Sequence, residues 1–348
     1  MEDRKSISVT AAPKRSYHCT SSHPFGLEMH QWNRIWVPPI HALGLYGIYL
    51  ILWGRVPWGV VYPTIVMGYF MGVGITVGCH RYWSHRTFKA KLPLQIFLAV
   101  AQTAAGQHSI FKWSKDHRLH HKYTETAADP YNSRRGFWFA HMGWLLVRED
   151  PAVREKEHCL DFSDLDNDPI VRFQSRHYRV LEFLAVFAVP IWTLMSLFPT
   201  MSLLDALAVN SFRYMTTLHF TWLVNSAAHL YGYKKYDTRI FARENKLVAL
   251  LAIGEGWHNY HHVYPQDYKA AELGAYGLNW SCAFIDLCAY FGLAYDLKTV
   301  PHEVVMARVR RTGDDAGGMT MTKVVAGVGR GVGGTSTSRR NTTTSRRP

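Results

Sequence analysis

The sequence predicts an all-α integral membrane protein with four transmembrane helices and a cytoplasmic helical cap that holds a histidine-rich site for two metal ions. Two observations carry this prediction. Apolar residues of the 348-residue chain lie in uncharged blocks of about 20 residues, the length that crosses about 30 Å of hydrocarbon. Eight of the 19 histidines fall in three short runs whose spacing brings imidazoles together, and His229 stands alone as a ninth candidate.

The apolar blocks define the predicted spans. Residues 35–54 and 56–79 contain no charged side chain and are separated by Arg55 alone, which predicts a hairpin of two helices. Two further spans are predicted at residues 183–204 and 205–228. The last of these contains Arg213, which a neighbouring helix or a carboxylate near the helix end can satisfy.

The apolar block at residues 92–111 is predicted to lie at the membrane surface as an interfacial helix. It contains three glutamines and His108, which are costly in lipid. A crossing at this point would also place the histidines that precede the block and those that follow it on opposite sides of the membrane.

Basic residues set the predicted orientation. Four of them follow the second span, namely Arg81, Arg86, Lys89 and Lys91, and several more precede the first span. By the positive-inside rule, both chain termini and every histidine run then lie in the cytoplasm. The net charge of +13 is explained by these flanks and by a basic tail, so nucleic-acid binding is a poor explanation of it, and no nucleic-acid partner is predicted.

Three segments follow from this reading. Residues 1–30 are predicted to be a cytoplasmic, disordered amino-terminal segment, and residues 31–300 form the membrane domain. Residues 301–348 are rich in Gly, Ser, Thr and Arg, which predicts a disordered basic tail.

The histidine spacing predicts the metal site. Residues three and four apart share a helix face, so HRLHH and HNYHH should each direct three imidazoles at one point, and two such triplets can bind two ions. In HRYWSH the two histidines lie roughly 140° apart on an ideal helix, so they converge only if the helix ends or bends. The predicted ligands are His80, His85, His117, His120, His121, His229, His258, His261 and His262, with Asn225 acting through a water molecule.

The ligand type narrows the choice of metal. Imidazole suits iron, zinc and copper. The five cysteines have no CxxC spacing and are poor ligand candidates.

Four runs of residues resemble the motifs of the membrane fatty acyl-CoA desaturases of the stearoyl-CoA desaturase type: HRYWSH, HRLHHKYTETAADPYNS, NSAAHLYGY and GEGWHNYHH. The resemblance extends over about residues 31–298. It implies a multi-pass enzyme of the endoplasmic reticulum membrane with two Fe²⁺ ions, which uses dioxygen and two electrons to place a cis double bond in a saturated fatty acyl-CoA, most often between carbons 9 and 10. It also implies cytochrome b5 and its reductase as separate electron donors, because the chain has no HPGG haem motif.

The resemblance further implies a kinked tunnel for the acyl chain beneath the metals. Trp113 and Trp222 stand where tunnel walls are expected, with plain core packing as the alternative for both. Side chains near Tyr69, Met71 or Val73 are expected to close the tunnel. The implied contacts to coenzyme A are Asn33, Lys115, Asp116 and Arg148. The chain departs from the family at Glu149, where a second basic residue is usual, and this weakens one phosphate contact.

Two alternatives remain at this point. The same scaffold can act at another carbon or hydroxylate its substrate, and product analysis separates these activities. A non-enzymatic membrane protein that binds metal is the more distant alternative, and metal content distinguishes it from a di-iron oxidase.

Carboxylates should orient the imidazoles of the predicted metal site by accepting hydrogen bonds from their free ring nitrogens. The candidates nearest in sequence are Asp116, Glu125, Asp129 and Glu255.

Overall fold

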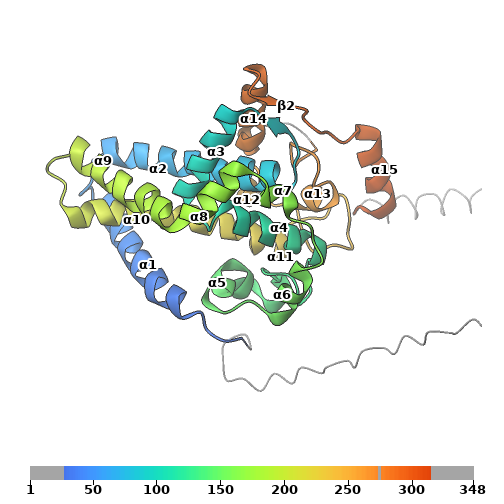
Figure 1. The fold of residues 1–348 in the computed structure, drawn as a ribbon, viewed down its shortest axis with the longest axis horizontal. Helices are drawn as coiled ribbons and strands as arrows, with labels where there is room; N and C mark the ends of the chain where they lie inside the picture. Colours follow the sequence, from blue (N-terminus) through green and yellow to red (C-terminus); the bar gives the residue numbers. More distant parts are fainter. Residues whose placement is uncertain (1–26, 273–275, 315–348) are drawn as a thin grey trace, which may run out of the picture.

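The structure is a computed structural model of the chain, and it describes residues 27–272 and 276–314. Helices form nearly all of its regular structure, as Figure 1 shows. The strands β1 (Lys89–Ala90) and β2 (Ala294–Tyr295) make a two-stranded antiparallel sheet in which Ala90 lies opposite Ala294. The predicted helical class is therefore confirmed for the described residues.

The helices of the described residues differ widely in length. The longer helices are α1 (Gln31–Leu52), α2 (Trp58–Val73), α3 (Leu92–Ala105), α4 (Ile110–Tyr123), α8 (Pro169–Phe183), α9 (Val189–Leu197), α10 (Leu203–Asn225), α14 (Trp280–Tyr290) and α15 (His302–Thr312). The shorter helices are α5 (Trp144–Leu146), α6 (Pro151–Glu157), α7 (Ser163–Asp166), α11 (Ala227–Leu230), α12 (Lys246–Leu251) and α13 (His258–Val263). The described residues also contain three π-helical segments, namely η2 (Gly74–Ser84), η4 (Phe139–Gly143) and η5 (Leu184–Ala188), and two 3-10 segments, η3 (Ser133–Arg135) and η6 (Tyr276–Leu278).

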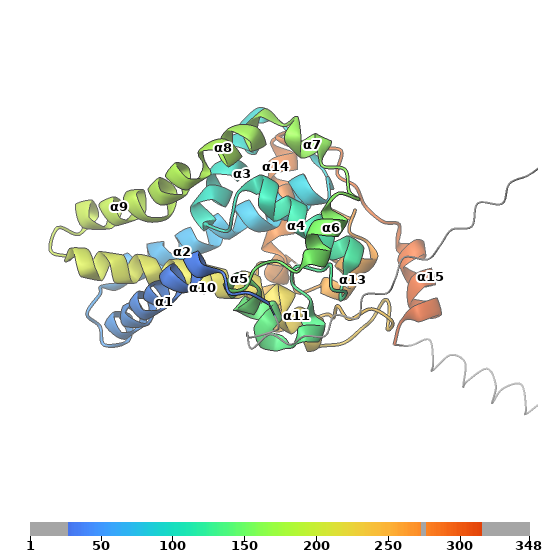
Figure 2. The same cartoon turned by 60° about the horizontal axis from the view of Figure 1, so that its bottom comes forward.

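Three helical stretches of the described residues are long and apolar enough to cross a membrane: Gln31–Leu52, Trp58–Ser84 and Pro169–Leu197. Figure 2 shows α1, α2, α9 and α10 projecting together at one end, with α4, α6 and α13 at the other. The helix α10 occupies the place of the predicted fourth span and has 23 residues, but polar side chains such as Asn210 make it less apolar.

Arg213 of α10 is buried, and its hydrogen-bond partners come from α2, from η5 and from α10 itself. Its guanidinium donates to the sulfur of Met71 at 2.7 Å, to the Asn210 Oδ1 atom at 3.0 Å and to the carbonyl oxygen of Val186 at 3.1 Å. The helix α10 also packs closely along α1, where a Cβ atom on Gly47 would lie 2.4 Å from the carbonyl oxygen of Ala208.

The segment predicted to be interfacial contains α3, which has 14 residues and is shorter than the roughly 20 that a span needs. It ends at Gly106, whose left-handed φ of 64° suits glycine and turns the chain toward α4. The helix packs tightly on η2, because a Cβ atom on Gly74 would lie 2.1 Å from the Gln102 nitrogen. This return brings α4 beside η2, so the first two histidine runs meet.

The two chain ends differ from the predicted disorder where the structure describes them. The disordered tail predicted from residue 301 is wrong over α15, whose Val305 and Val309 pack against Tyr236 and Tyr260. Valines four residues apart lie on one face of a helix, so they can be buried together. The average composition of residues 301–348 did not reveal this short apolar pattern. Near the other end, the backbone nitrogen of His30 donates to the carbonyl oxygen of Leu146 at 2.7 Å. Residues 1–26 and 315–348 lie outside the described residues.

Candidate metal centre

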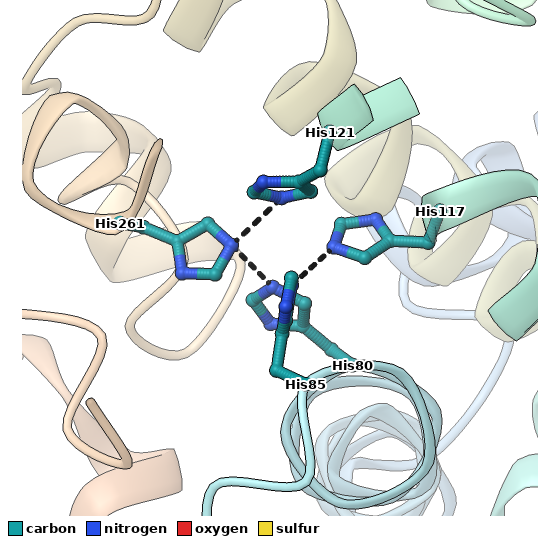
Figure 3. A group of neighbouring side chains, drawn as sticks. All are labelled: His80, His85, His117, His121 and His261. Carbon is teal, nitrogen blue, oxygen red and sulfur yellow. Dashed lines mark hydrogen bonds between the residues drawn. The ribbon is translucent and has the colours of Figure 1, made fainter. Parts of the chain in front are cut away.

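The nine predicted histidines gather in two adjoining groups. The larger group is His80, His85, His117, His121 and His261, shown in Figure 3. The smaller group is His120, His229, His258 and His262. Within each group, one ring nitrogen from every residue lies within 4.8 Å of the others. The groups touch where the rings of His121 and His262 stack with centroids 4.3 Å apart.

Each histidine triplet contributes to both groups, so the prediction that a triplet points at one site is wrong. In α4, His117 and His121 join the larger group, whereas His120 joins the smaller one. The helix α13 reverses this pattern, because only His261 of its triplet joins the larger group. At about 100° per residue, positions i and i+4 diverge by about 40°, while position i+3 points about 60–100° away from both. The same spacing therefore supplies two sites.

The convergence of His80 and His85 comes from a wider helix. They lie on η2 and at its end, where the nitrogen of His85 donates to the carbonyl oxygen of His80 at 3.1 Å, a hydrogen bond across five residues. Such π-helical turns hold more residues than α-helical turns, so side chains five apart come onto one face. The two ring centroids lie 5.0 Å apart.

Three buried carboxylates hold the outer nitrogens of three rings. The pairs are His80 with Glu255 (Nδ1 to Oε2, 2.6 Å), His120 with Asp129 (Nδ1 to Oδ1, 2.8 Å) and His229 with Glu125 (Nδ1 to Oε1, 2.7 Å). Each pair fixes a ring so that its Nε2 atom faces the cluster, as carboxylates do around metal-binding histidines. Three of the four nearby carboxylates considered from the sequence take this position, and Asp116 does not.

The loop that follows α4 places two of these carboxylates. Asp129 accepts hydrogen bonds from the backbone nitrogens of Glu125 and Tyr131, both at 2.9 Å. Glu125 has a positive φ of 58°, and its carboxylate accepts a hydrogen bond from Ser133 at 3.1 Å. The run TETAADPYNS therefore folds back on α4 and holds its carboxylates behind His120 and His229.

The environment keeps most of these imidazoles neutral, which is the form that binds metals. Burial, together with the nearby imidazoles, lowers the pKa of six rings well below the usual value: those of His85, His117, His121, His258, His261 and His262. At His120, burial alone would lower the pKa, but the Asp129 carboxylate raises it. Burial likewise opposes ionisation of Glu255, yet the Arg81 guanidinium and His80 lower its pKa to about 2.

The donor set fits metal ions. The buried Nε2 atom of His120 has no hydrogen-bond partner among the described residues. Neighbouring Nε2 atoms in both groups lie 2.8–3.0 Å apart. Two nitrogens that are each about 2.1 Å from one ion and at right angles are about 3 Å apart. Nine imidazoles without a cysteine are the ligand type that iron, zinc and copper accept.

Two cavities meet at this centre. The first, of about 310 Å³, extends from His80 and His258 between α2 and α10 to Thr64. The second, of about 390 Å³, is lined by residues of α1, α5 and α10. Four residues line both cavities, namely Trp113, His117, Thr221 and Asn225. Nothing in the sequence predicted that Thr221 would line the site, because its position there depends on where the two cavities join.

The residues expected at the tunnel lie at these cavities. Trp113 lines both, and Trp222 lines the second, where Asn33 also lies and donates from Nδ2 to the carbonyl oxygen of Leu145 at 2.6 Å. At the far end of the first cavity, Tyr69 contributes to the lining as expected. Met71 and Val73 do not line it, whereas Gly68 and Gly72 do.

Three of the implied coenzyme A contacts are engaged elsewhere and line neither of these two cavities. Lys115 pairs with Glu157 at 2.8 Å, and Arg148 pairs with Glu28 at 3.1 Å. Asp116 is buried against Lys112 at 2.6 Å, and Lys112 also pairs with Glu149. The departure at Glu149 thus adds a carboxylate to a cluster of ion pairs.

Comparisons with known proteins agree with this arrangement. A family model described as fatty acid desaturase matches residues 55–276. The chain is 49% identical over 293 residues to the acyl-CoA Delta12-desaturase of Acheta domesticus, covering 84% of this chain and 81% of the relative. It is 48% identical over 275 residues to the acyl-CoA Delta-9 desaturase of the same species (79% and 76%) and 48% identical over 285 residues to the stearoyl-CoA desaturase of Bos taurus (82% and 78%). The chain belongs to the fatty acid desaturase family.

Proposed function

We propose that the chain is an acyl-CoA desaturase, which uses dioxygen and two electrons to introduce a cis double bond into a saturated fatty acyl-CoA. One observation carries the proposal: two clusters of buried imidazoles open onto two largely apolar cavities that meet beside them. A saturated methylene has no acidic proton, so acid, base or nucleophilic side chains cannot start the reaction. Two iron ions held by the nine histidines, with Asn225 acting through water, would supply the oxidising chemistry with dioxygen.

The protein contributes position and the exclusion of water. Side chains such as Ile65, Ile75, Phe220 and Val224 line the first cavity and suit an acyl chain. Where the cavities join, Trp113 stacks on the ring of His117 with centroids 5.0 Å apart. An acyl chain that passes from one cavity to the other would bend here, with its middle carbons beneath the imidazoles. This placement accounts for attack at an internal carbon.

The position of the new bond is proposed to be between carbons 9 and 10. Relatives of nearly equal identity are named as Delta12 and Delta-9 enzymes, so identity alone does not choose between the two positions. Mass spectrometry of the products formed from stearoyl-CoA, with cytochrome b5, its reductase and NADH as the electron supply, tests the proposal directly. We expect an 18-carbon product with a cis bond at carbon 9. A hydroxylated product, or no oxidation by the iron-loaded protein, would contradict desaturation.

Membrane placement and partners form part of the same proposal. The helix α10 is taken as the fourth span, with both termini and the histidines on the cytoplasmic side of the endoplasmic reticulum. The apolar side of α3 supports a position at the membrane surface, because Leu92, Ile96 and Val100 are exposed at four-residue intervals along one face. Cytochrome b5 and its reductase are the proposed electron donors.

Replacing Gly72 by leucine should shorten the acyl chains that the enzyme prefers. A Cβ atom at Gly72 would lie 3.4 Å from the Ile253 side chain, so a larger group must extend into the first cavity. We expect the ratio of kcat/KM for myristoyl-CoA to that for stearoyl-CoA to rise about tenfold or more, which corresponds to roughly 1.4 kcal/mol. Gly59 has nothing within 4 Å of its Cβ position and gives the matched control, Gly59→Leu. An unchanged ratio in Gly72→Leu would show that the acyl end lies elsewhere.

A further inference from the structure

Three histidines outside the metal groups form a hydrogen-bonded row beside the second cavity. They come from three segments that are distant in the chain: His41 from α1, His219 from α10 and His141 from η4. Figure 2 shows α1 and α10 side by side, and α5, which directly follows η4, lies next to them. We name the three rings the histidine row. Ionisable side chains are costly within membrane helices, so two of them in α1 and α10 point to a role.

The row begins at the backbone of α1 and passes through all three rings. The Nδ1 atom of His41 lies 2.8 Å from the carbonyl oxygen of Val37, and its Nε2 atom lies 3.1 Å from the Nε2 atom of His219. The other ring nitrogen of His219, Nδ1, lies 2.9 Å from the Nε2 atom of His141. Each ring therefore uses both of its nitrogens in the row.

The inner end of the row closes on Trp222. The Nδ1 atom of His141 lies 3.0 Å from the Ser226 Oγ atom, which lies 2.8 Å from the carbonyl oxygen of Trp222. The indole of Trp222 also packs against the row, with its ring centroid 5.1 Å from that of His219, 5.8 Å from that of His141 and 6.4 Å from that of His41. Trp222 is buried and lines the second cavity. The row thus contacts both the backbone and the ring of a cavity wall.

The row has one hydrogen fewer than its contacts require. A neutral imidazole carries one N–H group, and a serine carries one O–H group. The three rings and Ser226 therefore supply four hydrogens for five contacts. Both ends of the row are carbonyl oxygens, which can only accept, so in the neutral row one contact joins two acceptors without a hydrogen between them. A single added proton gives every contact a donor.

The charged groups nearby do not neutralise such a proton. Among the described residues, none of the three rings forms an ion pair. Burial lowers the pKa of His141 from its usual value, so the proton enters below neutral pH. The charged groups of the elements packed against the row lie or pair elsewhere: Arg34 and Asp205 in the first turns of α1 and α10, Lys246 at the start of α12, Arg213 with Asn210, Arg134 over Phe241, Arg135 with Asp150, and His229 of α11 with Glu125.

We propose that the histidine row takes up one proton and, in this form, holds Trp222 in place as a wall of the second cavity. The three histidines line neither of the two cavities, so they are positioning residues that act through Trp222. The inference rests on the proposed function, because it takes the second cavity as part of the acyl-CoA site. Acyl-CoA should then bind more tightly as the pH is lowered and the row becomes protonated.

Fluorine NMR of the full-length, zinc-loaded protein labelled with 5-fluorotryptophan tests the positioning of Trp222 without turnover. Zinc occupies both metal groups, so their imidazoles do not titrate. Trp222→Phe identifies the Trp222 resonance, which should move in one protonation step as the pH falls from about 7 to about 5. In His219→Phe, three contacts remain with three hydrogens to fill them, so this step should be lost.

Matched variants separate the hydrogen bonds of the row from its bulk. His219→Gln can donate to one neighbouring ring and accept from the other, so the row again lacks one hydrogen and should keep the protonation step. His41→Phe shortens the row from its other end, also leaves as many hydrogens as contacts, and should lose the step. His177→Phe removes an exposed imidazole of α8 outside the row and should titrate as the parent protein does.

Calorimetry of stearoyl-CoA binding to the same zinc-loaded protein measures the effect on the substrate. The ratio of the Kd of His219→Phe to the Kd of the parent protein cancels the titration of the coenzyme A phosphates. We expect this ratio to rise about fivefold as the pH falls through the protonation step, an effect typical of one hydrogen bond. For His219→Gln, the corresponding ratio should stay constant.

The outcomes separate this inference from its alternatives. A Trp222 resonance that moves alike in His219→Phe and the parent protein, or that moves in neither, would overturn it. A Kd ratio that is independent of pH would also overturn it, because the row would then be a structural brace without effect on the substrate. If both measurements agree with expectation but the iron-loaded parent protein forms no double bond in stearoyl-CoA, the proposed function fails and the role of the row stands.

Discussion

Replacing His120 by alanine is expected to abolish desaturation and to lower bound iron from two ions toward one per chain. His120 belongs to the smaller group, so its loss leaves three rings there. Its buried Nε2 atom has no hydrogen-bond partner among the described residues, so the main chemical consequence of replacing His120 is the loss of a metal contact. The activity loss should exceed the 10–100-fold effect typical of removing an outer partner of a metal ligand.

A comparison within the larger group makes this prediction sharper. That group has five rings, so His85→Ala leaves four and should retain more iron than His120→Ala. Metal analysis of purified protein, with product formation from stearoyl-CoA on the same samples, checks both variants. His158→Ala removes an exposed histidine outside the clusters and should keep both iron and activity. Two irons per chain and unchanged turnover in His120→Ala would contradict the assignment of the smaller group.

Features with a local period could be predicted from the sequence, and features that depend on packing could not. Blocks of uncharged residues located α1 and α2 closely, and histidine spacing selected the nine rings that the structure gathers. The division of each triplet follows from helix geometry, but the group that each position joins depends on how α4 and α13 face each other and could not be predicted. The π-helix at His80 could not be predicted either. The spacing of His80 and His85 showed only that the helix must end or bend if the two rings are to converge.

Ion pairs between residues that are distant in the chain were the feature least predictable from the sequence. The motif residues Lys115 and Arg148 appeared as free cations, yet the structure pairs each with a glutamate distant in the chain. Conversely, the arginines of α8 had no predicted role, and the position of Arg179 beside the second cavity comes from the packing of α8 on α4. Sequence reasoning therefore found the metal chemistry more readily than the surface that would receive a polar head group.

Replacing Glu255 by leucine is expected to destabilise the fold by about 3–5 kcal/mol, because it leaves a buried arginine without its countercharge. Arg81 is 1% exposed, and its guanidinium donates to the Glu255 Oε1 atom at 2.7 Å and to the carbonyl oxygen of Tyr268 at 3.0 Å. The same carboxylate lies 2.6 Å from the His80 Nδ1 atom. One side chain thus joins the first histidine run to the third, and its removal should also weaken metal binding about 10–100-fold.

Thermal unfolding of the metal-free protein in detergent separates the two effects, because it reports the fold without the metal. Glu255→Gln keeps a hydrogen-bond acceptor for Arg81 and should lose less stability than Glu255→Leu. Glu155→Leu changes an exposed carboxylate and should unfold as the parent protein does. The double variant Arg81→Met with Glu255→Leu removes both charges, so it should be more stable than Glu255→Leu alone. If the stability lost by the double variant equalled the sum of the losses in Arg81→Met and Glu255→Leu, the ion pair would not be what joins the first and third histidine runs. The orientation of His80 would then need another explanation.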